Sequence, residues 1–314
     1  MAKVVVIRNP TGGRGAHNRI WPDVLARLRA SFSDLAVHET EYPGHAQSLA
    51  LEASNGDSHL VIAVGGDGTI SQVANGIFGT NCTLGIIPGG TGNDLCRTLE
   101  IDQDPLRAVD TVIGAIATPI DVGRWRSEGS ERIFVNVAGI GFDAAVATRI
   151  NSGFKRIRGK TAYLAATVAE LARFKPRSLQ VTTNGETRQL APMLLAIANA
   201  TTYGAGMKIA PQASVVDGLL DLIIVQNLSK LSFIKSFPLV FKGAHLDHPA
   251  VDLIKTNRLE LKFSEPTPFL VDGELITATD LNIELIPGSL RVILPADSKL
   301  CRSNCEAVCD TCSP

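Results

Sequence analysis

Three glycine-rich turns carry the residues of this chain that are best suited to binding a polyphosphate. The turns are NPTGG at 9–13, GGDGT at 65–69 and PGGTGND at 88–94, and each follows a short apolar run. Such turns leave backbone N–H groups accessible and allow a ligand to approach the main chain closely. Parallel strands place their carboxyl ends at one edge of a sheet, so we expect the three turns to meet there. One such turn alone could be a plain tight connection, but together they predict a nucleotide site.

The elements that must position these turns alternate between strand and helix. Strands are expected at 3–8, 35–40, 59–64 and 83–88, where short runs are rich in Val, Ile and Leu. Helical spacing of apolar residues predicts helices at 22–30, 44–54 and 70–77 and a further helix that starts near Asp94. This alternation predicts a doubly wound, parallel α/β domain over residues 1–125.

After about residue 125 the pattern changes to strands joined by turns. Strands are expected at 131–138, 178–183, 192–199, 219–226, 258–263, 267–271 and 281–286, and helices at 159–174 and 229–241. The pattern predicts an antiparallel, β-sandwich-like domain over residues 126–295, with a last strand that could return to the first domain. Residues 296–314 form a separate tail that is rich in cysteine.

Size and charge narrow the class of protein. The chain has 314 residues, which is more than one core usually holds, and its formal net charge is −1 with 19% charged residues. This balance provides no long-range attraction to nucleic acid, so no nucleic-acid partner is expected. No apolar run is long enough to span a bilayer and no signal-peptide pattern opens the chain, so we expect a cytoplasmic protein.

The motifs resemble a known family when they are taken in order. NPTGG, GGDGT and PGGTGND, followed by DGE at 272–274, resemble the diacylglycerol kinase catalytic family of bacterial lipid kinases, which is related to sphingosine and ceramide kinases. AxxxDGLLD at 213–221 and KGAHLDHP at 242–249 extend the resemblance to about Pro295. GGDG alone would be weak, since NAD kinases and phosphofructokinases carry it too. The resemblance implies a nucleotide domain, a β-rich lipid domain and a reaction in the cleft between them.

The resemblance also implies which residues contact ATP. They are Asn9, Pro10, Thr11, Gly12, Gly13, Thr40, Gly65, Gly66, Asp67, Gly68, Thr69, Ile70, Ser71 and Thr91. Glycine N–H groups would hold phosphate oxygens, threonine hydroxyls would donate hydrogen bonds, and Asp67 would hold Mg²⁺ or position the phosphates. The chain has no GxxxxGK[ST] loop and no HRD loop, so P-loop and protein-kinase mechanisms are disfavoured.

A hydroxyl nucleophile needs a group that takes its proton, and the resemblance places that role in the DGE turn. Glu274 is the first candidate, and Asp272 is a second that could instead hold metal. The sequence does not separate them. Without the upstream motifs, an Asp-Gly pair between strands would simply predict a hairpin turn.

The AxxxDGLLD turn resembles a magnesium site of the same family. Asp217 would bind the ion by its side chain, and Ser214 and Leu219 would offer backbone carbonyls. The alternative is a plain turn before the strand that follows.

Two segments are not explained by these motifs. Residues 154–160, FKRIRGK, carry four basic side chains and could meet an anionic membrane or form a solvated loop. Cys301, Cys305, Cys309 and Cys312 would share one helical face. The alternatives for this tail are a disordered or redox-exposed segment, a zinc or iron–sulfur site, and S-acylation.

These observations lead to one functional hypothesis with two alternatives. We expect an ATP- and Mg²⁺-dependent lipid kinase that phosphorylates a hydroxyl of diacylglycerol or a related lipid. The partner would be a lipid at the membrane surface, with peripheral contact at the inner membrane face. The chain could also form a homodimer. The alternatives are an NAD kinase-like enzyme and a non-catalytic nucleotide-sensing protein that binds lipid.

Overall fold

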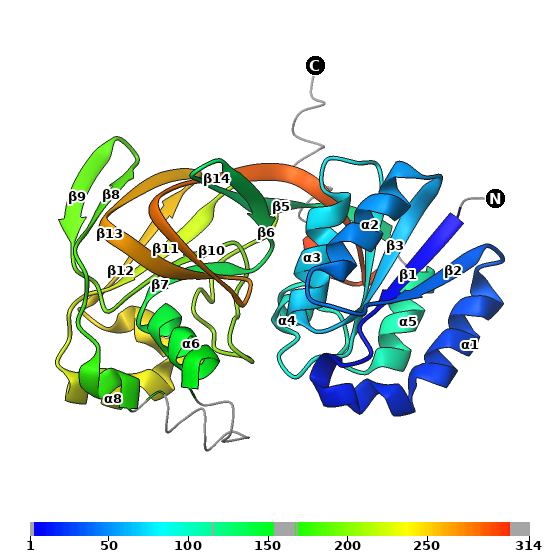
Figure 1. Cartoon of the computed structure of the whole chain (residues 1–314), viewed down its shortest axis with the longest axis horizontal. Helices are drawn as coiled ribbons and strands as arrows, with labels where there is room; N and C mark the ends of the chain where they lie inside the picture. The colour runs from blue at the N-terminus through cyan, green and yellow to red at the C-terminus, as the bar shows by residue number, and fades with distance from the viewer. Residues whose placement is uncertain (1–2, 115, 154–166, 168, 302–314) are drawn as a thin grey trace.

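The protein has two lobes joined by long strands (Figure 1). The computed structural model describes residues 3–114, 116–153, 167 and 169–301. The N-terminal lobe is drawn in blue to cyan, and the C-terminal lobe in green to orange. None of the described helices is both long and apolar enough to cross a membrane.

The N-terminal lobe is a parallel sheet with helices on both faces. Its strands are β1 (Lys3–Arg8), β2 (Leu35–Glu39), β3 (Ser58–Gly65) and β4 (Thr83–Pro88), in the order β2-β1-β3-β4. Its helices are the 3₁₀ helix η1 (Gly12–Arg19), α1 (Trp21–Ser31), α2 (His45–Asn55), α3 (Asp67–Ile77), α4 (Asp94–Thr98) and α5 (Pro105–Gly114). Alternate residues of β1 face opposite layers, since Val4 packs with α1 and α5 whereas Val5 packs with α2 and α3. The predicted doubly wound domain is confirmed.

The C-terminal lobe is built from antiparallel strands. They are β5 (Ile116–Ser127), β6 (Ser130–Phe134), β7 (Val137–Gly141), β8 (Leu179–Thr183), β9 (Glu186–Leu190), β10 (Leu194–Ala198), β11 (Leu220–Val225), β12 (Val251–Thr256), β13 (Arg258–Val271) and β14 (Glu274–Leu294). Helices α6 (Phe142–Gly153) and α8 (Lys230–Ser236) and the 3₁₀ helices η2 (Phe237–Lys242) and η3 (Ala244–Asp247) complete the lobe. The predicted β-sandwich-like class is confirmed.

The two longest strands differ from the sequence-based prediction. The runs expected at 258–263 and 267–271 form the single strand β13, with a register shift between Lys262 and Thr267. The run expected at 281–286 is the middle of β14, which has 21 residues. β14 begins beside the DGE turn and ends in parallel pairing with β4, where Arg291 lies opposite Thr83. β14 and its antiparallel partner β5 therefore tie the lobes together (Figure 1).

Two other predicted elements are divided in the structure. The run at 131–138 becomes β6 and β7, because the backbone N–H groups of Val135, Asn136 and Val137 donate to the Asp272 side chain. The helix at 229–241 becomes α8 and η2, with Pro238, which has no N–H to donate, beside the division. Most of the helix predicted at 159–174, all of the basic stretch 154–160 and the tail beyond residue 301 lie outside the described residues.

The packing of α2 against α3 gives a stability test. A Cβ at Gly76 of α3 would lie 2.5 Å from the Gln47 carbonyl oxygen and 2.6 Å from the Ala50 Cβ of α2. Gly76→Ala should lower the free energy of unfolding by about 1–3 kcal/mol, although alanine is the better helix former. The control is Gly114→Ala at the end of α5, where a Cβ would meet nothing within 4 Å. Urea unfolding measures both, and equal stabilities would contradict the packing argument.

Candidate active site

The three glycine turns meet through their main chains at the carboxyl edge of the parallel sheet. The N–H of Gly89 donates to the Gly65 carbonyl at 2.7 Å, and that of Asn9 donates to the Val64 carbonyl at 2.9 Å. A Cβ at Gly90 would lie 2.5 Å from the Gly66 Cα, which is closer than real Cβ contacts. Side chains at these positions would push the turns apart, so the glycines are needed for this convergence.

A pocket opens beside the first two turns. Its lining residues are Asn9, Thr11, Gly12, Thr40, Glu41, Tyr42, Pro43, Ala46, Gly66, Gly68, Thr69 and Gln72. The Asn9 side chain shapes it, since its Oδ1 accepts from the Thr11 N–H and hydroxyl while its Nδ2 donates to Thr69 Oγ1 at 3.1 Å. α3 starts at Asp67, directly behind this pocket, so the first backbone N–H groups of a helix lie at its edge.

The pocket contains part of the predicted ATP-contacting set. Asn9, Thr11, Gly12, Thr40, Gly66, Gly68 and Thr69 line it. Pro10, Gly13, Gly65, Asp67, Ile70, Ser71 and Thr91 are not among its lining residues. The side chain of Ile70 is fully buried in the core, and Ser71 lines a neighbouring pocket. Their roles toward ATP stay predictions.

Asp67 links the second turn to the third. Its Oδ1 accepts hydrogen bonds from the backbone N–H groups of Asp94 at 2.6 Å and Leu95 at 3.3 Å, at the start of α4. Burial raises the pKa of Asp67, and the nearby charge of Asp94 raises it further. Asp67 thus holds the third turn against the second and carries a charge that a cation would stabilise.

Asp94 joins the lobes, and the sequence analysis assigned it no role. Its side chain is buried and accepts from the N–H groups of Ala205 at 2.8 Å and Gly206 at 2.7 Å, in the loop before β11. Its position at the end of PGGTGND was the only available signal. The partners lie more than 110 residues away in sequence, so only the fold reveals the contact.

Asp272 belongs to the C-terminal lobe and accepts a hydrogen bond from the N-terminal lobe. Its carboxylate accepts from Ser71 Oγ of α3 at 2.9 Å and from three backbone N–H groups, those of Val135, Asn136 and Val137. The residue has a positive φ of 47°, which the tight turn between β13 and β14 requires. Burial raises the pKa of Asp272 to about 6, and the backbone N–H groups and Ser71 oppose this rise.

Glu274 lies on the open side of the same turn. It is exposed and forms an ion pair with Arg132, with 2.9 Å between Glu274 Oε2 and Arg132 Nη1. Both residues line a small pocket together with Ser71, Gln72 and Asn75 of α3. Gln72 also lines the glycine-turn pocket, so the two pockets adjoin at this residue of α3.

The AxxxDGLLD turn lies apart from these pockets. Asp217 accepts from the Leu219 N–H at 3.1 Å and from Lys255 Nζ at 2.8 Å, and Lys255 Nζ also lies 3.4 Å from buried Asp221. Within the described residues, no three His, Cys, Asp or Glu side chains are grouped as metal ligands. The Lys255 ammonium supplies the positive charge at this turn. A metal role for Ser214, Asp217 and Leu219 stays a prediction.

The fold and the paired pockets define a two-lobed protein whose glycine turns face an acidic turn of the other lobe. The pattern of the diacylglycerol kinase catalytic domain matches residues 3–125, and that of the YegS C-terminal NAD kinase beta sandwich-like domain matches residues 136–294. The chain belongs to the diacylglycerol kinase catalytic family and is a lipid kinase. The resemblance stated from the motifs is therefore confirmed.

Curated relatives and solved structures agree with this assignment. A diacylglycerol kinase of Bacillus subtilis (strain 168) is 32% identical over 87% of this chain and 90% of its own length. One from Mycobacterium tuberculosis (strain CDC 1551 / Oshkosh) is 32% identical over 94% of this chain and 96% of its own. The crystal structure of a candidate diacylglycerol kinase from Bacillus anthracis str. Sterne has a TM-score of 0.76 and 25% identity, and the match covers 93% of this chain and 95% of the other.

The raised pKa of Asp272 predicts a specific pH dependence of stability. Between its ordinary value of 3.8 and about 6, the folded carboxyl keeps a proton that the unfolded one has lost. The wild-type free energy of unfolding should therefore fall by up to about 3 kcal/mol as pH rises through this window. Asp272→Asn lacks this contribution, so the stability of wild type relative to the variant should decrease between about pH 4 and pH 7. Urea unfolding of both across that range measures it, and a constant difference would refute the assignment.

Proposed function

We propose that this lipid kinase transfers the γ-phosphate of ATP, supplied with Mg²⁺, to a hydroxyl of diacylglycerol or a closely related lipid alcohol. The observation that carries the proposal is the pair of pockets that adjoin at Gln72 of α3. One presents the glycine turns and the start of α3, and the other presents Glu274. The curated relatives named diacylglycerol kinase support the choice of acceptor.

The glycine-turn pocket is proposed to hold the triphosphate. The backbone N–H groups of Gly12, Gly66 and Gly68 and the hydroxyls of Thr11 and Thr40 surround this space and would donate to phosphate oxygens. Phosphoryl transfer requires mainly positioning and charge neutralisation, and these groups supply both.

Asp67 is the residue proposed to hold Mg²⁺ together with phosphate oxygens. Burial and the charge of Asp94 raise the pKa of Asp67, so a cation beside its carboxylate would relieve an unfavourable interaction. Carboxylate and phosphate oxygens are the hard donors that Mg²⁺ prefers. When bound, the ion would neutralise charge on the transferred phosphate.

Glu274 is proposed as the base that accepts the proton of the lipid hydroxyl. It is exposed in the pocket next to Ser71 and Gln72, so a substrate hydroxyl can reach it. Asp272 already accepts four hydrogen bonds, which leaves it poorly placed to take a proton from a substrate. We assign Asp272 the role of holding α3 against the DGE turn.

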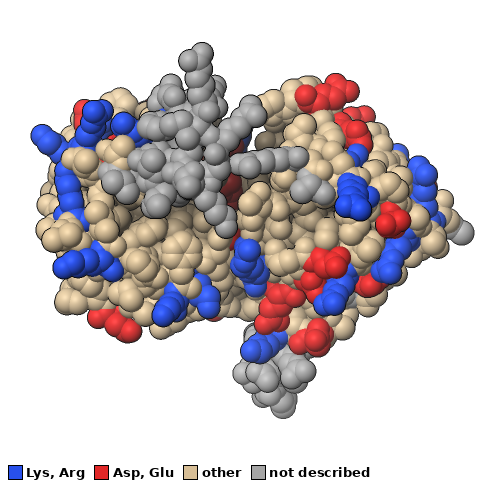
Figure 2. All heavy atoms as spheres, turned by 90° about the horizontal axis from the view of Figure 1, so that it is seen from below, with Lys and Arg blue, Asp and Glu red and all other residues tan. Residues whose placement is uncertain are grey.

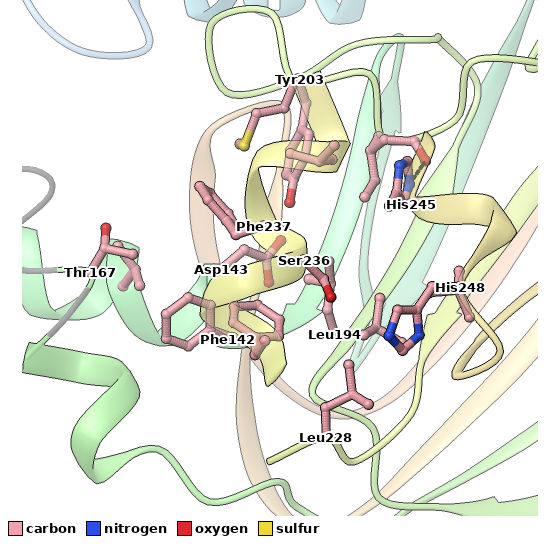
Figure 3. A pocket seen from close by; sticks show the side chains of 17 residues that line it. Phe142, Asp143, Thr167, Leu194, Tyr203, Leu228, Ser236, Phe237, His245 and His248 are labelled. Carbon is pink, nitrogen blue, oxygen red and sulfur yellow. Dashed lines mark hydrogen bonds between the residues drawn. The ribbon is translucent and has the colours of Figure 1, made fainter. Parts of the chain in front are cut away.

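An apolar cavity of about 80 Å³ in the C-terminal lobe is proposed to take part of an acyl chain. Figure 3 shows Phe142, Asp143, Ser236, Phe237 and His248 arranged around this space. Most other lining residues are aliphatic, namely Val146, Leu194, Met207, Ile209, Val225, Leu228, Val240 and Val251. Burial raises the pKa of Asp143 to about 7, so near neutrality a large share of this carboxyl is protonated and can donate a hydrogen bond to an ester oxygen.

A panel of acceptors tests the function directly. With γ-labelled ATP and Mg²⁺, we expect transfer of label to diacylglycerol or a related lipid alcohol, because the apolar cavity is proposed to take part of an acyl chain. Monoacylglycerol, phosphatidylglycerol, sphingoid base and ceramide complete the lipid panel. NAD is included because its kinases share GGDG and the second domain is NAD kinase-like. Label on NAD alone, or on no acceptor while ATP still binds, would overturn the proposal.

Two conservative substitutions separate the proposed roles. Glu274→Gln should lower kcat by roughly 10²–10⁴-fold with little change in KM for ATP, because it removes the proton acceptor while its amide oxygen can still accept from Arg132. Asp67→Asn keeps an oxygen for the Asp94 and Leu95 N–H groups but removes the charge, so it should abolish turnover while the fold persists. Steady-state kinetics measure these effects, and circular dichroism checks the fold. Full activity of either variant would disprove its assigned role.

A further inference from the structure

Exposed apolar side chains gather on the outer surface of α8 and η2. Leu231, Ile234, Leu239 and Phe241 are 64%, 48%, 36% and 49% exposed. They are four of the eight large apolar side chains that the described residues expose, and they lie within eleven consecutive positions. Apolar residues scattered singly need no explanation, but a contiguous group on one element indicates a surface that meets an apolar partner. We call Lys230–Lys242 the α8–η2 segment.

The charge of this segment has one sign. Lys230, Lys235 and Lys242 are exposed, and residues 229–243 contain no Asp or Glu. The Lys230 ammonium donates to the Ala172 carbonyl, which brings the exposed Arg173 close to the segment. Figure 2 shows Lys and Arg along the outer edge of the C-terminal lobe with few acidic residues among them, whereas the other lobe mixes both signs.

The inner side of the same segment lines the apolar cavity. Phe233, Phe237 and Val240 face that space. Successive aromatic rings connect the interior to the surface, with centroid distances of 5.1 Å for Phe142–Phe233, 6.2 Å for Phe233–Phe237 and 6.0 Å for Phe237–Phe241. An ordinary surface helix is apolar toward the core and polar toward water. This segment is apolar on both sides and basic at its edges, which is typical of an element that lies on a membrane.

We propose that the α8–η2 segment docks on an anionic lipid bilayer and admits the substrate's acyl chain to the cavity behind it. Leu231, Ile234 and Phe241 would enter the headgroup region, and the lysines would contact anionic headgroups. The route for the acyl chain rests on the proposed function, because it requires a lipid substrate. A second copy of the chain fits this surface less well, since a symmetric contact would bring lysines against lysines.

Vesicle binding of the full chain tests the docking without any catalytic step. In co-sedimentation without ATP, wild type should bind phosphatidylcholine vesicles that contain phosphatidylglycerol better than phosphatidylcholine alone, and less well as salt rises. The double variant Leu231→Gln, Ile234→Gln should lose binding by about tenfold or more. Lys235→Gln with Lys242→Gln should remove most of the preference for anionic lipid and its salt dependence.

The matched control is Leu51→Gln with Ile113→Gln. These residues are 51% and 41% exposed on α2 and α5 of the other lobe, so the chemistry of the substitution is the same at an unrelated surface. The control should bind vesicles like wild type. Equal losses in both double variants, or no loss in Leu231→Gln, Ile234→Gln, would overturn the proposal. All four residues are exposed, and thermal unfolding checks that each variant keeps its fold.

Activity assays separate this proposal from the proposed function. The Leu231→Gln, Ile234→Gln variant should keep wild-type turnover of a soluble short-chain diacylglycerol and lose turnover of long-chain diacylglycerol in vesicles. Failure of wild type on both substrates would refute the proposed function, while vesicle binding still tests the docking.

Light scattering decides whether the α8–η2 segment meets a bilayer or a second copy of the chain. A wild-type dimer that this variant converts to monomer, with vesicle binding unchanged, would show a self-association surface and overturn the proposal.

Discussion

The close approach of three backbone turns is the constraint on which the rest of this structure depends. Gly65, Gly66, Gly89 and Gly90 allow the second and third turns to touch through their main chains. This contact places the start of α3 at the pocket and brings α4 within reach of the Asp67 carboxylate. Any side chain large enough to separate the turns would also displace these two helices. The glycines therefore act by lacking a Cβ. The hydrogen bonds accepted by the carboxylates then hold the turns in place.

A carboxylate of each lobe accepts hydrogen bonds from donors of the other lobe, and these contacts join the two lobes. Asp94 of the N-terminal lobe accepts from N–H groups of the C-terminal lobe, and Asp272 accepts from Ser71 in the other direction. β14 adds a covalent path, because one strand runs from the DGE turn to the edge of the parallel sheet. Charged acceptors make stronger hydrogen bonds than neutral ones, so these contacts are well suited to hold α3 between the two pockets.

Much of the fold followed from local patterns. β1, β3 and β4 were located closely, because both faces of each are largely buried and the runs are almost continuously apolar. The edge strand β2 was located from the shorter apolar run at 35–37, which is partly buried. β14 was missed as a single strand, since its pairing with β5 shifts register between Ile286 and Leu290, where Gly288 has a positive φ of 54°. The α3 start was placed three residues late, at Ile70, because Gly68 is a poor helix former and masks the first turn.

The sequence by itself determined the order and composition of the phosphate-binding turns, because strand, turn and helix signals act over a few residues. It also indicated the family, and it named Glu274 and Asp272 without separating them. Only the tertiary structure decided that the Asp272 carboxylate accepts four hydrogen bonds, whereas the Glu274 side chain is exposed. It also decided that Asp94 contacts the other lobe. Those outcomes depend on residues more than a hundred positions apart, whose distances are set by sheet pairing and core packing.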